Sequence, residues 1–309
     1  MGEANRVVIL GVFVADTAYR ADRAPRMGET ILGKSFKLGP GGKGSNQAVA
    51  AARLGADVSF ITRLGEDAFA DMAFRTWVEA GVTPAVTRAP DSYTGAAYIF
   101  IEEATGDNAI IICPGAAATI VPADLDAQAG LIADASVFVT QLEQPLEAAV
   151  RGLEIARDNG VTTILNPAPG RELPDAVLGL CDYLTPNETE AEALTGMPVV
   201  DVEAARAAAE RLRERGVGTV VMTLGARGAL LHGQGRSAVV PAIAAGPVVE
   251  TTGAGDAFNG GFATGLARGM DPWEAVRLGC ATAGISVTRP GTAPSMPTLA
   301  EVKALLARG

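Results

Sequence analysis

The stretch "TTGAGDAFNGGF", residues 251 to 262, places a single carboxylate, Asp256, at the end of a glycine-rich turn. A helical pattern follows from about Ala257 to Ala267. Glycine lets backbone amides approach a ligand closely, and the free N–H groups of a helix N-terminus favour an anion. The turn therefore predicts an anion hole at residues 253–255, and a carboxylate beside it can accept a proton from a hydroxyl group that attacks phosphorus. A structural helix cap is the alternative role for this aspartate.

A second glycine-rich turn, "LGPGGKGSNQAVAAARLG" at residues 38 to 55, precedes an alanine-rich helical pattern over residues 46–54. It matches neither the Walker phosphate loop nor the dinucleotide-binding fingerprint. Lys43 and Asn46 offer a cation and an amide, which are donors that suit sugar hydroxyl groups. The alternative is a tight turn that serves only to start a helix.

Apolar strand-like runs alternate with helical patterns along most of the chain. The expected strands are Val7–Val14, Val58–Thr62, Val137–Thr140, Thr162–Asn166, Tyr183–Thr185 and Thr219–Leu224. The expected helices, besides the two above, are Ala68–Ala80, Leu146–Asp158 and Val202–Arg215. Continuous apolar strands that alternate with helices predict an α/β fold, with a mostly parallel central sheet flanked by helices on both faces.

Two segments interrupt this alternation, at about residues 12–40 and 95–113. The first holds a polar, irregular stretch followed by the alternating "ILGKSFKLG", and the second reads as a hairpin closed by Thr105–Asn108. We expect both to form a small antiparallel β lid on a single core domain that spans residues 1–309. A dimerisation flap is the alternative, and one sheet can serve both purposes.

Composition and charge narrow the class of protein. The 309 residues are 48% hydrophobic and 19% charged, which is typical of a folded protein, and the net charge of −10 without a basic block argues against nucleic-acid or membrane-surface binding. Three scattered cysteines indicate reduced thiols and a cytoplasmic protein. The run at residues 7–15 is expected to be a buried strand rather than a signal peptide. The single histidine, His232, argues against a serine–histidine–aspartate triad and a histidine-rich zinc site.

Two further stretches carry polar or glycine-rich turns. "LTPNETEAEALTG", residues 184 to 196, moves from a strand to a helix with Asn187, Glu188 and Glu190 at the junction. Oxygen donors there predict a Mg²⁺ position reached through water, and carboxylates that complement the helix dipole are the alternative. "TLGARGALL", residues 223 to 231, predicts a strand–turn–strand whose glycines admit a flat base or a ribose.

Four of these stretches together resemble the ribokinase family of carbohydrate kinases: GGKGSNQA, TPNETEAE, TLGARG and TTGAGDAFNG, in this order and at these separations. The similarity extends over nearly the whole chain, including "TQLEQP" at 140–145 and "LNPAPGRELP" at 165–174. The resemblance implies a Rossmann-like core with a β lid. It also implies transfer of the γ-phosphate of ATP to the primary hydroxyl group of a pentose or related sugar.

The resemblance implies roles for individual residues as well. Asp256 becomes the general base, and the amides of Gly253, Ala254 and Gly255 become the anion hole. The implied sugar contacts are Asp16, Gly42, Lys43, Asn46, Glu143 and Asp256. The implied ATP contacts are Asn187, Thr223, Leu224, Gly225, Ala226, Arg227, Gly228, Gly255 and Cys280. Glu190 is implied to hold Mg²⁺ indirectly, and a K⁺ ion is implied at Glu250, Thr252, Ser286, Arg289, Gly291 and Ser295, several of them through backbone carbonyls.

Three positions depart from the family pattern. Val14 stands where an asparagine usually precedes the aspartate by two residues, Ala117 stands where asparagine is common, and Glu250 replaces the usual aspartate. Loss of a hydrogen-bonding partner for a buried hydroxyl group costs about 1–3 kcal/mol. The acceptor can therefore be ribose, a deoxypentose, or a sugar with a carbon group at that position. Arg20 shares a strand face with Val14 and Asp16, so a sugar acid is a further alternative.

Other functions stay open at this point. A nucleoside, hexose or sugar-acid kinase of the same family is one alternative, and a non-catalytic sugar or nucleoside sensor is another. A sensor has no need of a base, so Asp256 together with both glycine turns favours the enzyme. The apolar runs "AAYIF" and "AIIIC" in the lid predict a homodimer formed through its exposed faces.

Overall fold

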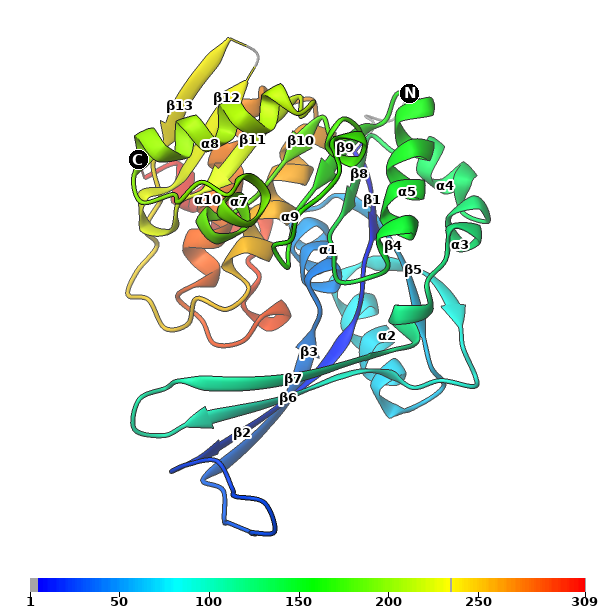
Figure 1. Cartoon of the computed structure of the whole chain (residues 1–309), viewed down its shortest axis with the longest axis vertical. Helices are drawn as coiled ribbons and strands as arrows, with labels where there is room; N and C mark the ends of the chain where they lie inside the picture. The colour runs from blue at the N-terminus through cyan, green and yellow to red at the C-terminus, as the bar shows by residue number, and fades with distance from the viewer. Residues whose placement is uncertain (1–4, 234, 309) are drawn as a thin grey trace.

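The computed structural model describes residues 5–233 and 235–308, and its strands form a large and a small sheet (Figure 1). The large sheet has nine strands in the order β13-β12-β11-β10-β9-β8-β1-β4-β5. Their bounds are β1 (Arg6–Leu10), β4 (Asp57–Leu64), β5 (Val82–Arg88), β8 (Val137–Thr140), β9 (Thr162–Leu165), β10 (Tyr183–Leu184), β11 (Thr219–Thr223), β12 (Ala229–Gly233) and β13 (Arg236–Val240). All neighbours pair in parallel except β11–β12 and β12–β13, so the predicted mostly parallel sheet is confirmed.

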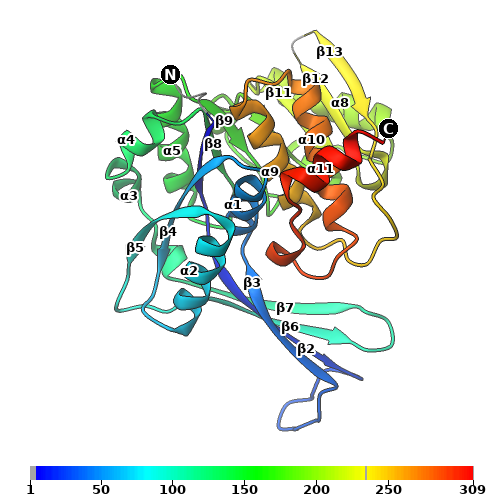
Figure 2. The ribbon, with the colours of Figure 1, turned by 180° about the vertical axis from the view of Figure 1, so that it is seen from behind.

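Helices cover both faces of this sheet, as predicted. The bounds are α1 (Lys43–Arg53), α2 (Ala68–Ala80), α3 (Pro122–Asp126), α4 (Ala129–Ala133), α5 (Leu146–Asp158), α6 (Asp175–Leu178), α7 (Glu188–Thr195), α8 (Val202–Glu214), α9 (Ala254–Ala267), α10 (Pro272–Ser286) and α11 (Leu299–Leu306). Helices α3, α4, α5, α7 and α8 lie toward the viewer in Figure 1, and α1, α2, α9, α10 and α11 do so in Figure 2. Each layer has its own apolar core, with Leu153 and Leu212 in one, and Trp77 and Phe262 in the other.

The first strand is shorter than predicted. The sequence suggested one strand over Val7–Val14, but β1 ends at Leu10 and Val14 begins the next strand. The chain leaves the large sheet at Gly11, where a Cβ would lie only 2.7 Å from the Cα of Gly44, so this segment must turn closely past the start of α1. Of the polar stretch at residues 16–30 that was predicted to be irregular, residues 16–21 belong to the regular strand that begins at Val14, and residues 22–30 are irregular as predicted.

The small sheet is the predicted lid, and it projects from one side of the large sheet (Figure 1). Its strands are β2 (Val14–Ala21), β3 (Ser35–Gly41), β6 (Thr94–Glu102) and β7 (Asn108–Gly115), in the order β3-β2-β6-β7. The pairs β2–β3 and β6–β7 are antiparallel as expected, while β2 and β6 join them in parallel. Because side chains alternate along a strand, one face of the lid turns toward the body and the other outward.

Helix α9 begins three residues earlier than predicted, at Ala254 rather than Ala257. Gly253 precedes it in the left-handed conformation with φ of 81°, which glycine adopts without strain. Further along, a Cβ at Gly260 would lie 2.5 Å from the Cβ of Ala50 in α1. One at Gly261 would lie 2.6 Å from the hydroxyl of Thr282 in α10. The glycine pair therefore lets α9 pack closely between two helices.

Three short helical turns complete the described elements: η1 (Ala116–Thr119), η2 (Gly225–Arg227) and η3 (Ala293–Ser295). Within the described ranges, the helices are all too short or too polar to cross a membrane. The single domain predicted over residues 1–309 includes positions outside the described ranges and stays a prediction.

Candidate active site

Asp256 lies between the two helices that follow the glycine-rich turns. The residue is 7% exposed, and its carboxylate accepts a hydrogen bond on each oxygen, from Asn46 Nδ2 to Oδ2 at 2.9 Å and from Gln47 Nε2 to Oδ1 at 3.2 Å. Both donors belong to α1, and the backbone N–H groups of α9 are not among its partners in the described chain. The helix-cap alternative for Asp256 is therefore wrong, because this side chain serves the contact between α1 and α9.

A polar cavity of about 160 Å³ opens directly above the start of α9. It is lined by Lys43, Asn166, Ala168, Thr185, Asn187, Glu190, Thr223, Gly253, Gly255, Asp256 and Asn259. A Cβ placed at Gly255 would meet no described atom within 4 Å, so the backbone there faces open space. Of the three amides predicted to form the anion hole, that of Ala254 already donates to the Thr251 carbonyl at 3.1 Å, while those of Gly253 and Gly255 have no hydrogen-bond partner among the described residues. The positive end of the α9 dipole and these two amides favour an anion.

One ammonium group faces several carboxylates in this region. Burial disfavours the charge of Lys43, but the carboxylates of Asp256, Glu143 and Glu190 outweigh it and raise the pKa of Lys43. Burial and the charge of Asp256 raise the pKa of Asp16 to about 6. Burial also raises the pKa of Glu143 to about 7, although Lys43 opposes the shift. Burial likewise raises the pKa of Asp256, against the effect of Lys43 and the two amides of α1. The site therefore holds carboxylates that are poised to exchange protons near neutral pH.

The residues predicted to contact a sugar come together around the start of α1. The backbone N–H of Lys43 donates to Glu143 Oε2 at 2.9 Å, which joins α1 to the segment after β8. A Cβ at Gly41 would lie 2.2 Å from the carboxylate of Asp16, so this glycine makes room for the aspartate. The carbonyl oxygen Oδ1 of Asn46 is buried and has no hydrogen-bond partner among the described residues. A hydroxyl group of a bound sugar would satisfy it.

Gly42, the remaining predicted sugar contact, is the residue before α1 and has φ of 88°. A Cβ there would lie 2.4 Å from the carbonyl oxygen of Val12. Gly42 therefore serves the tight turn that starts α1. This structural role does not conflict with its predicted role as a sugar contact.

A larger cleft of about 530 Å³ adjoins the polar cavity and shares Asn187, Thr223 and Gly255 with it. Of the other predicted ATP contacts, the cleft is lined by Gly225, Ala226, Gly228 and Cys280. Two predicted contacts do not line the cleft: Leu224 is 2% exposed within the apolar core, and Arg227 pairs at 3.0 Å with Glu188, which does line it. The cleft is largely apolar and meets the polar cavity at Gly255, which suits a ligand with a flat apolar part and an anionic end.

Asn187 and Glu190 form a reciprocal cap at the start of α7. Glu190 N donates to Asn187 Oδ1 at 2.8 Å, and Asn187 N donates to Glu190 Oε2 at 2.9 Å. The alternative role of these two residues, at the start of a helix, is therefore confirmed. Both side chains also line the polar cavity. The described residues contain no cluster of three or more histidine, cysteine, aspartate or glutamate side chains that could hold a metal ion. A Mg²⁺ ion at this position would thus rely on water and ligand oxygens.

The six residues predicted to bind K⁺ lie in two neighbouring segments, 250–252 and 286–295. Glu250 Oε2 accepts a hydrogen bond from the backbone N–H of Gly291 at 2.8 Å, which joins the segments. The Ser286 hydroxyl donates to the Ala283 carbonyl within α10, and the Ser295 hydroxyl donates to the Thr292 carbonyl, so the lone pairs of both hydroxyl oxygens stay available as acceptors. These oxygens are of the hard type that an alkali cation prefers.

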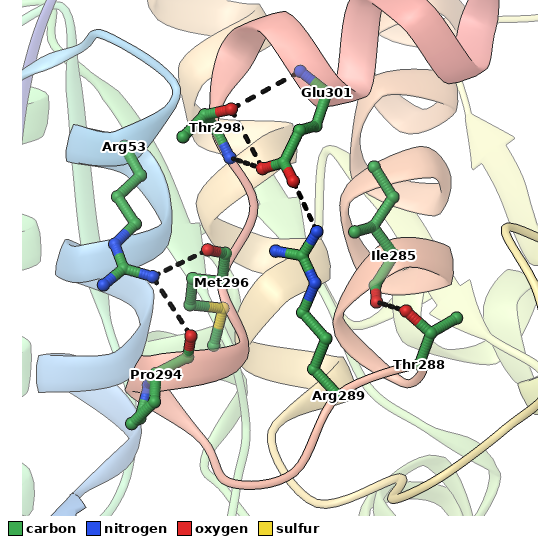
Figure 3. Close-up of polar contacts among 8 residues, drawn as sticks. All are labelled: Arg53, Ile285, Thr288, Arg289, Pro294, Met296, Thr298 and Glu301. Carbon is green, nitrogen blue, oxygen red and sulfur yellow. Dashed lines mark hydrogen bonds and ion pairs between the residues drawn. The ribbon is translucent and has the colours of Figure 1, made fainter.

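Two arginines hold the second of these segments in place (Figure 3). The Arg289 guanidinium donates to Glu301 at the start of α11, and this bond lowers the pKa of Glu301 to about 2. From the other side, Arg53 of α1 donates to the carbonyl oxygens of Pro294 and Met296, at 3.2 and 2.7 Å. The segment is therefore fixed between α1 and α11.

Five buried polar residues of the site were missed by the sequence analysis. Gln141 donates to Gln47 at 2.7 Å, and Gln47 donates to Asn166 at 3.2 Å. Thr185 donates to Asn259 at 2.6 Å, and Asn166 donates to the Thr185 carbonyl at 2.9 Å. Three of them, Gln141, Asn166 and Thr185, directly follow β8, β9 and β10. The carboxyl ends of parallel strands meet at one edge of the sheet, so a polar residue directly after a predicted strand is the sequence signal that could have found them.

The model of the pfkB family of carbohydrate kinases matches residues 4–299. This chain belongs to the pfkB family. The predicted resemblance to ribokinase-like carbohydrate kinases is therefore confirmed, and the protein is a carbohydrate kinase by family, an enzyme that phosphorylates a hydroxyl group. The sensor alternative is not favoured by these comparisons.

Several relatives and solved structures are similar to this pfkB-family kinase over nearly its whole length. A ribokinase from Haemophilus influenzae is 38% identical and covers 96% of both chains. A deoxyribokinase from Salmonella typhimurium is also 38% identical, over 95% of this chain and 96% of its own. The structure of Arabidopsis thaliana ribokinase complexed with ribose and ATP superposes with a TM-score of 0.93 at 33% identity, over 97% of this chain and 98% of that one.

Proposed function

We propose that the protein transfers the γ-phosphate of ATP to the primary hydroxyl group of a pentose, with Asp256 as general base. The observation that carries this proposal is the position of Asp256, which lines the polar cavity together with Gly253 and Gly255 at the start of α9. ATP would occupy the larger cleft with its terminal phosphate at Gly255, the residue that both hollows share. The similar structure of Arabidopsis thaliana ribokinase, which is a complex with ribose and ATP, supports the same pair of ligands.

The groups around the cavity suit an in-line transfer. The sugar oxygen attacks the γ-phosphorus as Asp256 accepts its proton, a new P–O bond forms, and the bond to the leaving oxygen of ADP breaks with its electron pair. The amides at the start of α9 and the Lys43 ammonium stabilise the charge that develops on the phosphoryl oxygens. Lys43 and the amides of Asn46 and Gln47 favour the ionised form of Asp256, which a base requires.

Two cations fit the residues that line these hollows. Mg²⁺, which neutralises phosphate oxygens when bound, would be held through water by Glu190, whose carboxylate lines the cavity. A monovalent cation, K⁺, would bind at Glu250 and the carbonyl and hydroxyl oxygens of residues 252–295 that the sequence predicted. Its charge would support the anion hole, because Thr252 immediately precedes Gly253.

The acceptor is a pentose. It either lacks one hydroxyl group, or has a hydroxyl group that binds without the hydrogen-bonding partner that an asparagine would supply. Val14 and Ala117 are 6% and 1% exposed and belong to the same apolar cluster, so both substitutions remove polar groups from one buried region. Arg20, the basis of the sugar-acid alternative, pairs with Glu103 at 3.6 Å on the lid. We therefore favour 2-deoxyribose or ribose over a sugar acid. A ribokinase and a deoxyribokinase are each 38% identical to this chain.

The outer face of the lid would bind a second copy of the chain. Tyr19, Phe36, Tyr98 and Ile111 lie on it and are 42%, 57%, 37% and 63% exposed. The three aromatic rings pack with centroids 5.0 and 5.5 Å apart, which makes a continuous apolar surface. Such a surface on a soluble protein marks an interaction site.

A location in the cytoplasm stays a prediction.

An ADP-release assay tests the proposed activity. Purified protein would be mixed with ATP, Mg²⁺ and K⁺ and with ribose, 2-deoxyribose, fructose, sugar acids or nucleosides in turn. We expect a pentose to give the largest kcat/KM. ATP binding without ADP release on any acceptor would contradict the proposal, and a preference for a nucleoside or a sugar acid would overturn the assigned substrate class.

A further inference from the structure

We propose that Gln47 is a positioning residue, which keeps the carboxylate of Asp256 ionised and in a fixed orientation for proton transfer. The inference rests on the proposed role of Asp256 as general base. It goes beyond that role because it assigns a function to a buried side chain that touches neither of the hollows. The amide of Gln47 is 0% exposed, so its hydrogen-bonding groups have only protein partners.

The amide nitrogen of Gln47 donates to two carbonyl or carboxylate oxygens at once. It lies 3.2 Å from Asp256 Oδ1 and 3.2 Å from Asn166 Oδ1. Asn46 holds the other carboxylate oxygen of Asp256 at 2.9 Å. With one bond to each oxygen, the carboxylate cannot rotate about its Cβ–Cγ bond without loss of a buried hydrogen bond. Each oxygen keeps a further lone pair that can accept the proton of the acceptor hydroxyl.

The orientation of the Gln47 amide is itself determined by a second glutamine. Gln141 Nε2 donates to Gln47 Oε1 at 2.7 Å, so the nitrogen of Gln47 must point toward Asp256. Gln141 lies against two glycines: a Cβ at Gly11 would be 2.5 Å from Gln141 Oε1, and one at Gly44 would be 2.8 Å away. Gly44 of the second glycine turn therefore makes room for the side chain that orients Gln47.

Charged groups on several elements face Asp256 and act on the same proton. They are Lys43 of α1, Asp16 of β2, Glu143 after β8 and Glu190 of α7. Burial disfavours the ionised form of Asp256, while Lys43 and the two amides favour it. Removal of the Gln47 amide leaves Asp256 buried and takes away one stabilising donor. The pKa of Asp256 must then rise.

The test replaces Gln47 by methionine, which has a similar length and lacks the amide. Gln144→Met is the matched control, because Gln144 is also buried and its amide bonds only Thr140 and the Gln141 carbonyl. The titration of Asp256 would be followed by NMR of the full ligand-free chain, with the aspartate carboxyl carbons labelled with ¹³C. The signal that is absent from Asp256→Asn belongs to Asp256. The acidic limb of kcat/KM would be measured on the same variants.

We expect Gln47→Met to move the Asp256 midpoint and the acidic limb upward by about one pH unit, and Gln144→Met to move neither. An unchanged midpoint in Gln47→Met, with Asp256→Asn inactive, would overturn the role of Gln47 and leave the base assignment intact. Near wild-type turnover by Asp256→Asn would instead overturn the base itself. If Gln47→Met does not fold, Gln47→Asn withdraws the amide by one methylene, and the same upward shift is expected.

Discussion

Asn46 of α1 and Asp256 of α9 meet in a hydrogen bond of 2.9 Å, although 210 residues separate them in the chain. The bond joins the starts of two helices whose glycine-rich turns were each ambiguous in the sequence. Asn46 also carries a buried carbonyl oxygen without a partner among the described residues. A single side chain thus holds the proposed base and keeps an acceptor for the proposed sugar, and the first prediction follows from that.

Replacement of Asn46 by alanine removes both contacts. We expect kcat/KM for the sugar to fall about 10- to 100-fold, because each lost hydrogen bond to a buried or charged group costs about 1–3 kcal/mol. The affinity for ATP, measured by calorimetry without sugar, should change little since Asn46 does not line the nucleotide cleft. A wild-type kcat/KM for the sugar would contradict this role.

Replacement of Glu143 by glutamine should stabilise the ligand-free protein at high pH. The pKa of Glu143 is raised from 4.5 to about 7, so the folded state binds the proton more tightly than the unfolded state. Its contribution to stability is therefore present below about pH 4.5 and is lost as the pH rises through about 7. At about pH 8 the variant should gain about 1–3 kcal/mol in the free energy of unfolding, with little difference at about pH 4.

Urea unfolding at both pH values measures this effect, and Glu147→Gln is the control. Glu147 is an exposed glutamate in the first turn of α5, so its replacement should change stability equally little at either pH. Equal stability of wild type and Glu143→Gln at about pH 8 would show that the ionised carboxylate of Glu143 does not destabilise the folded protein, which would contradict its raised pKa.

Replacement of Val14 by asparagine should shift acceptor preference toward ribose. The new amide offers a partner to a hydroxyl group that 2-deoxyribose lacks, so the ratio of kcat/KM for ribose over 2-deoxyribose should rise about 10-fold or more. Val14→Ala is the matched control, since it removes bulk at the same buried position without a polar group. The same rise in both variants would assign the effect to space rather than to hydrogen bonding.

A charge on the outer lid face should prevent association of two chains. We expect Ile111→Glu to shift the protein from dimer to monomer in light scattering at micromolar concentration, because a buried unpaired carboxylate is costly. Val200→Glu places the same charge at another exposed apolar position, 75% exposed before α8, and should leave the dimer intact. A wild-type protein that is monomeric at that concentration would remove the dimer proposal.

Much of the fold could be predicted because hydrophobic periodicity determines it locally. The predicted bounds of α2 and α5 match the structure residue for residue, since both helices have polar outer faces and clear apolar inner faces. Helix α10 was not predicted, because its alanine, glycine and threonine residues give no clear face. The early starts of α1 and α9 were missed for a related reason, as glycine-rich turns hide the first helical turn.

The site could be predicted only in part. Motifs placed Asp256, Lys43 and Asn46 correctly beside one another, because each stands in a distinctive local stretch. The pairing of Gln47 with Asp256 spans 209 residues and has no local signal. Leu224 also lies within a motif, but it directly follows β11, and its side chain is buried in the core and does not line the nucleotide cleft.

Single-turnover phosphoryl transfer by Asp256→Asn tests the central claim most directly. The variant keeps the shape of the side chain and removes its capacity to accept a proton. With ATP, Mg²⁺, K⁺ and the preferred pentose, we predict a rate at least 10²- to 10⁴-fold below that of the wild type, the usual contribution of a general base, with the Kd for ATP retained. A rate close to that of the wild type would contradict the assignment of Asp256 as the base.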